Sequence, residues 1–115
     1  MTQDTVRLLE ESIQRDRQHV ELAKALERLQ SNRDFKLLVS EGYLEKEAIR
    51  LVHLKADPSM QSPQSQAAVI TQIDAIGGLL GYFRTVAQLS NMAVKSIEQA
   101  EFSRDEILAE EAQRG

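Results

Sequence analysis

Few side chains in this sequence have the types and spacing that catalysis or metal binding requires. The chain has no Cys and two His, His19 and His53. Without Cys, disulfide frameworks, thiolate catalysis, zinc ribbons and iron–sulfur clusters are excluded. Neither His has a second His at a ligand spacing, and the nearby Asp16 and Asp57 are generic carboxylates, so no metal site is predicted. No carboxylate pair stands out as an acid–base pair, so we expect neither an enzyme nor a cofactor.

The distribution of charge gives little support for nucleic-acid binding. The net charge is −4, and acidic and basic residues cancel over residues 1–55. The excess negative charge lies after Ile97, in Glu98, Glu101, Asp105, Glu106, Glu110 and Glu111. Phosphate recognition needs clustered Lys and Arg, which this chain lacks. The acidic tail is either a solvated helix face or a segment that docks on a basic partner.

The positions of the apolar residues in the second half of the chain predict a long helix with a coiled-coil-like seam. Four- and three-residue steps alternate through four heptads. The seam consists of Val69, Ile73, Ile76, Leu80, Phe83, Ala87, Ser90, Val94 and Ile97. A second stripe lies beside it, formed by Ile70, Leu79, Val86, Leu89 and Ala93.

Charged residues are scarce in this predicted helix. From Pro58 to Ile97 they are Asp74, Arg84 and Lys95. Two apolar stripes with so little charge predict burial on at least two sides, against the chain itself or against another copy. The residues predicted to form an oligomer or partner interface are Val69, Ile73, Ile76, Gly77, Leu80, Gly81, Phe83, Ala87, Val94 and Ile97.

Three glycines interrupt the predicted helix at Gly77, Gly78 and Gly81. Together they cost about 2–3 kcal/mol of helix stability relative to alanine. Gly77 and Gly81 share a face, which would let another helix approach closely. The alternatives are a kink or break that divides the helix in two, and a hinge or membrane-active segment.

The first half of the chain predicts three shorter helices. Asp4 is a suitable N-cap for a helix over about 5–30, and Ser31-Asn32 favours a break after it. Gly42 fits the left-handed conformation that ends many helices. The predicted second and third helices are therefore 33–41 and 44–56.

Two prolines mark the connection to the long helix. Asp57 precedes Pro58 and so avoids helical dihedral angles, while Ser62 and Pro63 form an N-cap and a first helical residue. The predicted organisation is an N-terminal helical segment 1–57, a linker 58–62, and a long C-terminal helix 63–115 with an acidic end. The fold class is all-α, an elongated helical hairpin or bundle that we expect to be oligomeric.

The sequence also predicts specific contacts for one aromatic residue, Tyr43, and one charged residue, Arg84. Tyr43 is expected to pack at a helix–helix corner, or else to belong to a partner site. Arg84, in a charge-poor stretch, is expected to have a specific partner, with Asp74 or an acid of another subunit as candidates.

Segments between Ala25 and Ala93 resemble small, mostly uncharacterised tailed-bacteriophage proteins associated with virion genes. They include Glu-Gly-Tyr-Leu from Glu41, Ala-Asp-Pro-Ser-Met-Gln from Ala56, and Ile-Gly-Gly-Leu-Leu-Gly-Tyr-Phe-Arg-Thr-Val from Ile76. The resemblance covers over half of the chain and gives no residue a catalytic role. It implies a phage origin and an assembly or packaging context.

These observations favour a non-enzymatic phage assembly or structural protein that self-associates through helices, with virion or host proteins as further partners. The alternative is a small acidic phage-encoded inhibitor or adaptor that binds a host protein. No membrane span and no secretory signal peptide are predicted, so the expected location is the host cytoplasm or the virion.

Overall fold

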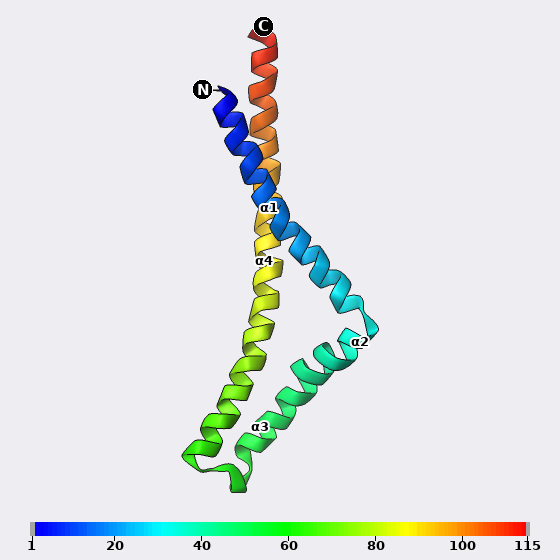
Figure 1. The fold of residues 1–115 in the computed structure, drawn as a ribbon, viewed down its shortest axis with the longest axis vertical. Helices are drawn as coiled ribbons and strands as arrows, with labels where there is room; N and C mark the ends of the chain where they lie inside the picture. Colours follow the sequence, from blue (N-terminus) through cyan, green and yellow to red (C-terminus); the bar gives the residue numbers. More distant parts are fainter. Residues whose placement is uncertain (1, 115) are drawn as a thin grey trace. The chain divides into compact units, whose positions relative to one another are not determined.

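The computed structural model describes residues 2–114, and every regular element in this range is a helix. The elements in chain order are α1 (Thr2–Ser31), α2 (Arg33–Phe35), η1 (Lys36–Glu47), α3 (Ala48–Ala56), η2 (Pro58–Met60) and α4 (Pro63–Arg114) (Figure 1). The predicted all-α class and long C-terminal helix are confirmed. Met1 and Gly115, the outer limits of the predicted segments, lie outside the described residues.

The chain forms two compact units that differ from the predicted linear segments. Unit 1 combines Met1–Ala25 with Val86–Gly115, and unit 2 is Leu26–Thr85. Helix α4 contributes residues to both units. Unit 1 is thus built from the two ends of the sequence, a pairing that local sequence patterns do not encode.

The predicted linker and the start of α4 have the expected local chemistry. Asp57 is extended, with ψ of 130°, and its carboxylate accepts a hydrogen bond from the Ser59 N–H at 2.8 Å. The Ser62 hydroxyl oxygen accepts a hydrogen bond from the Ser65 N–H at 3.1 Å, and α4 begins at Pro63. The N-cap at Ser62 is confirmed.

The predicted C-terminal end of α1 agrees with the structure, whereas its predicted start does not. The break after α1 is confirmed, because Asn32 is extended and its side-chain oxygen accepts a hydrogen bond from the Phe35 N–H at 3.0 Å. The predicted start after Asp4 is wrong: α1 begins at Thr2, so Asp4 lies inside the first turn. There its carboxylate lies 3.8 Å from the Arg7 guanidinium, a pairing available to residues three apart on a helix.

The predicted helix end at Gly42 is also wrong. The helical run from Arg33 to Ala56 is uninterrupted, and no glycine among the described residues has a positive φ. Gly42 lies in η1, a π-helix, whose hydrogen bonds join residues five apart. A Cβ at position 42 would lie 2.7 Å from the Leu37 carbonyl oxygen, five residues earlier. Glycine is therefore suited to this position by its small size rather than by a left-handed conformation.

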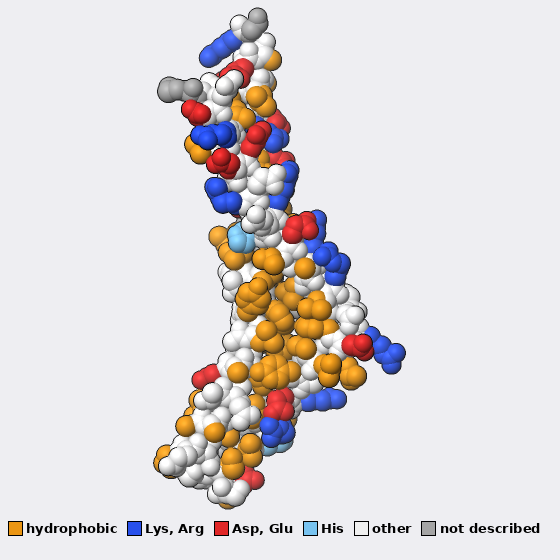
Figure 2. All heavy atoms as spheres, in the orientation of Figure 1, with side chains coloured by type: hydrophobic (Ala, Val, Ile, Leu, Met, Phe, Trp, Pro, Cys, Tyr) orange, Lys and Arg blue, Asp and Glu red, His pale blue; other side chains and the backbone are white. Residues whose placement is uncertain are grey.

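In unit 1, α1 runs antiparallel to the C-terminal part of α4 (Figure 1). The start of α1 lies beside the end of α4, where Thr2 and Thr5 line a shallow hollow together with Ile107 and Arg114. The side chains buried in this unit are Ile13, Val86, Ala93 and Ala100. Small alanine side chains on α4 let α1 approach closely, and charged side chains cover the outside (Figure 2).

In unit 2, the run from α2 to α3 lies beside the N-terminal part of α4 (Figure 1). The core is a cluster of Leu51, Val69 and Ile76, which are 1%, 1% and 5% exposed. Half-buried side chains surround it: Tyr43, Leu44, Ala48, Leu54, Met60 and Ile73. Hydrophobic side chains also gather on the visible surface near α2 and η1 (Figure 2).

Candidate interaction surface

The first half of the predicted interface is covered by the chain itself. Val69 and Ile76 belong to the core of unit 2, where they pack with Leu51 of α3. The half-buried seam residues of this stretch are Ile73, Leu80 and Phe83. The seam in unit 2 is therefore filled within the chain, and a partner would have to use another face of α4.

The second half of the predicted interface is turned partly outward. Val86 and Ala93 are buried, whereas Ala87 and Val94 are exposed, Val94 by 44%. Ile97 is half-buried. The reason is geometric: a seven-residue repeat drifts by about 20° per heptad around a straight α-helix, so a straight helix does not keep all seam residues on one side.

The three glycines of α4 lie in an unbroken helix and face open space. α4 continues through Gly77, Gly78 and Gly81, so a division of the helix at this point is not observed. A Cβ built on any of the three would have no neighbouring atom within 4 Å, apart from the helix's own backbone. The close helix contact predicted at Gly77 and Gly81 does not occur within the chain.

The two charged residues nearest to these glycines have no ionic partner. Asp74 and Arg84 are both exposed, and among the described residues neither takes part in an ion pair or a side-chain hydrogen bond. The predicted pairing of Arg84 with Asp74 is therefore not present. The other candidate, an acid of a second subunit, stays a prediction.

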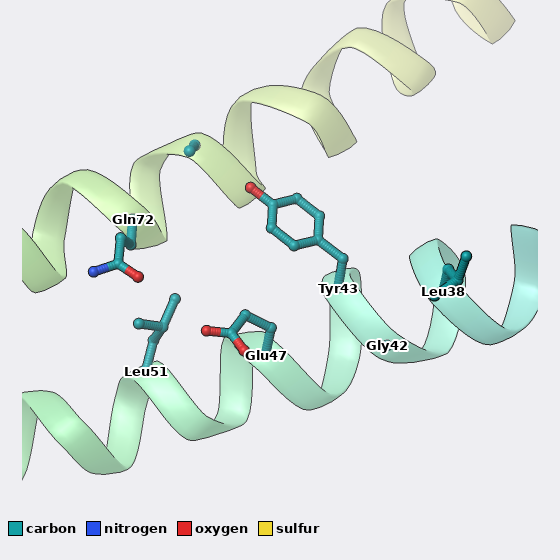
Figure 3. Close-up of a pocket in the computed structure, with 7 residues that line it drawn as sticks. Leu38, Gly42, Tyr43, Glu47, Leu51 and Gln72 are labelled. Atoms are coloured by element: carbon teal, nitrogen blue, oxygen red, sulfur yellow. The ribbon is translucent and has the colours of Figure 1, made fainter.

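A groove of about 340 Å³ separates η1 and α3 from α4 in unit 2 (Figure 3). It is lined by Leu38, Gly42, Tyr43, Glu47, Leu51, Gln72 and Ala75. The Tyr43 ring extends from η1 toward α4 (Figure 3) and packs against the core of unit 2. Tyr43 thus has the packing role expected for it, but inside a continuous helix instead of at a corner.

The polar group with the most defined surroundings in this groove is the Glu47 carboxylate. Its two oxygens accept hydrogen bonds from the Arg50 Nε at 3.0 and 3.1 Å, and Arg50 Nη2 also donates to Oε1. These hydrogen bonds lower the pKa of Glu47 below its usual value. A carboxylate that is ionised and already paired at neutral pH is a weak general base, so this groove has the character of a packing surface.

The described residues offer little for metal or membrane chemistry. No group of three or more acidic, His or Cys side chains within 2–114 is arranged to hold a metal ion. His19 belongs to unit 1 and His53 to unit 2. No helix in the described part of the chain is long and apolar enough to cross a membrane.

Three features of the structure were not predicted from the sequence. The π-helix η1 has no signal in the sequence apart from Gly42. The close approach of Gly42 to the Leu37 carbonyl oxygen is visible only in the folded backbone. The ion pair between Arg17 and Glu101, at 3.6 Å, depends on the pairing of the chain ends. In the same unit, one carboxylate oxygen of Asp16 is buried without a hydrogen bond.

The fold and this surface define an all-helical protein with exposed apolar and glycine-lined faces. Comparison of the chain with protein-family models, with curated proteins and with solved structures gave no match.

Proposed function

We propose that this chain is a non-enzymatic phage assembly or structural protein that acts by helix-mediated self-association. The phage context rests on the resemblance of segments between Ala25 and Ala93 to virion-associated phage proteins. The mode of action rests on the surface of the molecule. One observation carries it: large apolar side chains remain exposed on α1, η1, α3 and α4.

The amount of exposed surface supports an oligomer. The chain has 8574 Å² of solvent-accessible surface, whereas a globular monomer of 13.0 kDa has about 6300 Å². The excess of about 2300 Å² per chain is sufficient for the large apolar interfaces of obligate homodimers, which bury about 2000–5000 Å² in total. A second copy that covered this excess would bring the exposed area of each chain to an ordinary value.

The exposed large apolar residues are found in both units. On the run from η1 to α3, the outward side chains include Leu37, Leu38, Ile49 and Val52, which are 57–71% exposed. On α4, they include Ile70, Tyr82, Leu89, Met92, Val94, Phe102 and Leu108, which are 37–65% exposed. Exposed large apolar side chains in this number are a feature of surfaces that contact other proteins.

The alternative is a small acidic phage-encoded inhibitor or adaptor that binds a host protein through a helical face or through its C-terminal acids. Most of these side chains are exposed in the structure, including Glu98, Asp105, Glu106, Glu110 and Glu111. However, Glu101 is paired with Arg17 and Asp105 with Arg104, so part of the negative charge is already compensated. The exposed large apolar side chains on α1, η1, α3 and α4 therefore favour self-association over binding through the acids.

Size-exclusion chromatography coupled to light scattering tests the proposal directly. At tens of micromolar protein, we expect a mass at least twice 13.0 kDa. A strict monomer across the concentration range would contradict self-association and leave the inhibitor as the better hypothesis. The phage role is tested separately, by mass spectrometry of purified virions for peptides of this chain.

A further inference from the structure

One strip of α4 is largely uncovered within unit 2 and carries both of its charged residues. It consists of Ile70, Asp74, Gly77, Gly81 and Arg84, separated by alternating four- and three-residue steps. Such steps place residues on one side of an α-helix. The strip lies beside the seam that packs on η1 and α3, about a quarter turn around α4 from the core of unit 2.

Four residues of this strip are exposed, and the fifth, Gly81, is half-buried. The Ile70 side chain is 42% exposed. Gly77 and Gly81 have open space where a side chain would be. Asp74 and Arg84 form no ion pair and no side-chain hydrogen bond with the rest of the described chain. The chain thus places opposite charges on an unpartnered helix face, on either side of its glycines.

The arrangement of these residues is symmetric about the middle of the strip. Asp74 and Arg84 are each five positions from Leu79, and Gly77 and Gly81 are each two positions from it. In an antiparallel helix pair with its twofold axis at this point, Asp74 of one copy would face Arg84 of the other. Gly77 of one copy would face Gly81 of the other at the point where the two helices cross.

We propose that this strip is an antiparallel, twofold-symmetric dimer interface between two copies of α4. Two equivalent ion pairs, Asp74 with Arg84 of the second copy and the reverse, would flank a close crossing at Gly77 and Gly81. This inference rests on the proposed self-association and assigns it a surface and an orientation. Twofold interfaces use the same patch on both subunits, and a patch with opposite charges at equal distances from its centre is self-complementary.

The charges select the antiparallel orientation. Two parallel copies in register would place Asp74 against Asp74 and Arg84 against Arg84, and like charges across an interface are destabilising. This interface also gives Gly77 and Gly81 a role as the contact point between two helices. Within one chain, they have open space around them and no such contact. Without side chains, two helices approach closely enough for backbone and side-chain packing to compensate for the low helix propensity of glycine.

Charge reversal tests the predicted ion pairs. The single variants Asp74→Arg and Arg84→Asp should each weaken the dimer about tenfold to hundredfold, measured as the dissociation constant by sedimentation equilibrium. The double variant carrying both changes should return to within a few-fold of the parent chain, because its charges are again complementary in the antiparallel pair. Glu45→Arg, an exposed reversal on η1, is the matched control and should leave dimerisation unchanged.

A pair of glycine variants tests the crossing independently of charge. Gly77→Leu and Gly78→Leu make the same change in helix propensity, on faces of α4 about 100° apart. A Cβ at either position has no neighbouring atom within 4 Å, apart from the helix's own backbone, so we expect both variants to stay folded. We expect Gly77→Leu to abolish dimerisation and Gly78→Leu to preserve it. If Gly77→Leu dimerises as well as the parent, the crossing at these glycines is wrong.

The orientation is tested by disulfide trapping, which is simple because the chain has no Cys. Under mild oxidation, a mixture of the Asp74→Cys and Arg84→Cys variants should form the mixed cross-link. Each variant alone should remain mostly uncrosslinked. Efficient cross-linking of Asp74→Cys with itself would demonstrate a parallel pair and overturn the proposal.

The outcomes separate this inference from the proposed function. A parent chain that is monomeric at all concentrations overturns both. A dimer that is insensitive to both charge reversals, or that the double variant does not restore, overturns the interface assigned here while self-association stands. Circular dichroism of each variant confirms that a lost dimer reflects a lost interface and not a lost fold.

Discussion

At the scale of single residues, the four glycines in the described helices differ in the space around them. Gly42 lies close to a carbonyl oxygen of its own helix, whereas Gly77, Gly78 and Gly81 face open space. The sequence alone does not distinguish these cases, because glycine weakens a helix equally in either setting. The distinction appears only when the position of the surrounding backbone is known.

We predict opposite effects for two Gly-to-Ala substitutions. Gly42→Ala should lower the free energy of unfolding by about 1–3 kcal/mol, because its Cβ would lie 2.7 Å from the Leu37 carbonyl oxygen and the backbone must move. Gly78→Ala should raise it by about 0.5–1 kcal/mol, since alanine has the higher helix propensity and no neighbour is within 4 Å. Urea denaturation of both variants checks the pair. Equal effects at the two positions would contradict the structure of η1.

A second prediction concerns the acid sensitivity of η1. Hydrogen bonds from Arg50 lower the pKa of Glu47 in the folded state, so the ionised form is favoured by folding. The resulting stabilisation is present above the unfolded-state pKa of about 4.3 and is lost as pH falls through the lower folded-state pKa. Glu47→Gln should therefore reduce the fall in melting temperature between about pH 5 and pH 3. Glu45→Gln, where no ion pair exists, is the control and should follow the parent chain.

At the scale of the elements, sequence patterns predicted the start of α4 and the break after α1, because Ser62-Pro63 and Asn32 act locally. They failed at Gly42, where a π-helix replaced the predicted helix end. They were incomplete for the seam, since the heptad pattern indicates which residues share a face but not what covers that face. The apolar residues of the predicted interface therefore divided into a covered group in unit 2 and a partly exposed group in unit 1, while Gly77 and Gly81 face open space.

This division predicts different effects for two substitutions at seam positions of α4. Ile76 is 5% exposed within the core of unit 2, so Ile76→Asp should cost more than about 3 kcal/mol and unfold the unit. Val94 is 44% exposed, so Val94→Asp should change the stability by less than about 0.5 kcal/mol. Thermal denaturation followed by circular dichroism measures both. A severe loss of stability for Val94→Asp would indicate that this face is covered by a partner.

At the scale of the whole molecule, helix propensity and apolar patterning were sufficient to predict the all-α class. They were insufficient to predict the two units, since the contact of Arg17 with Glu101 joins residues 84 positions apart in the sequence. Neither end carries a local signal for this pairing. Within the acidic tail, Glu101 gains an ionic partner from α1, Arg17, once the ends are paired.

The construction of unit 1 from both ends of the chain has a consequence for biosynthesis. Unit 2 is complete once Thr85 has left the ribosome, whereas the part of α4 that packs on α1 is made only after it. During translation, the apolar stripe of α1 that contains Ile13 must therefore remain unpaired or be held by a chaperone. A nascent chain stalled after unit 2 should consequently resist protease within residues 26–85 and be cleaved readily in α1.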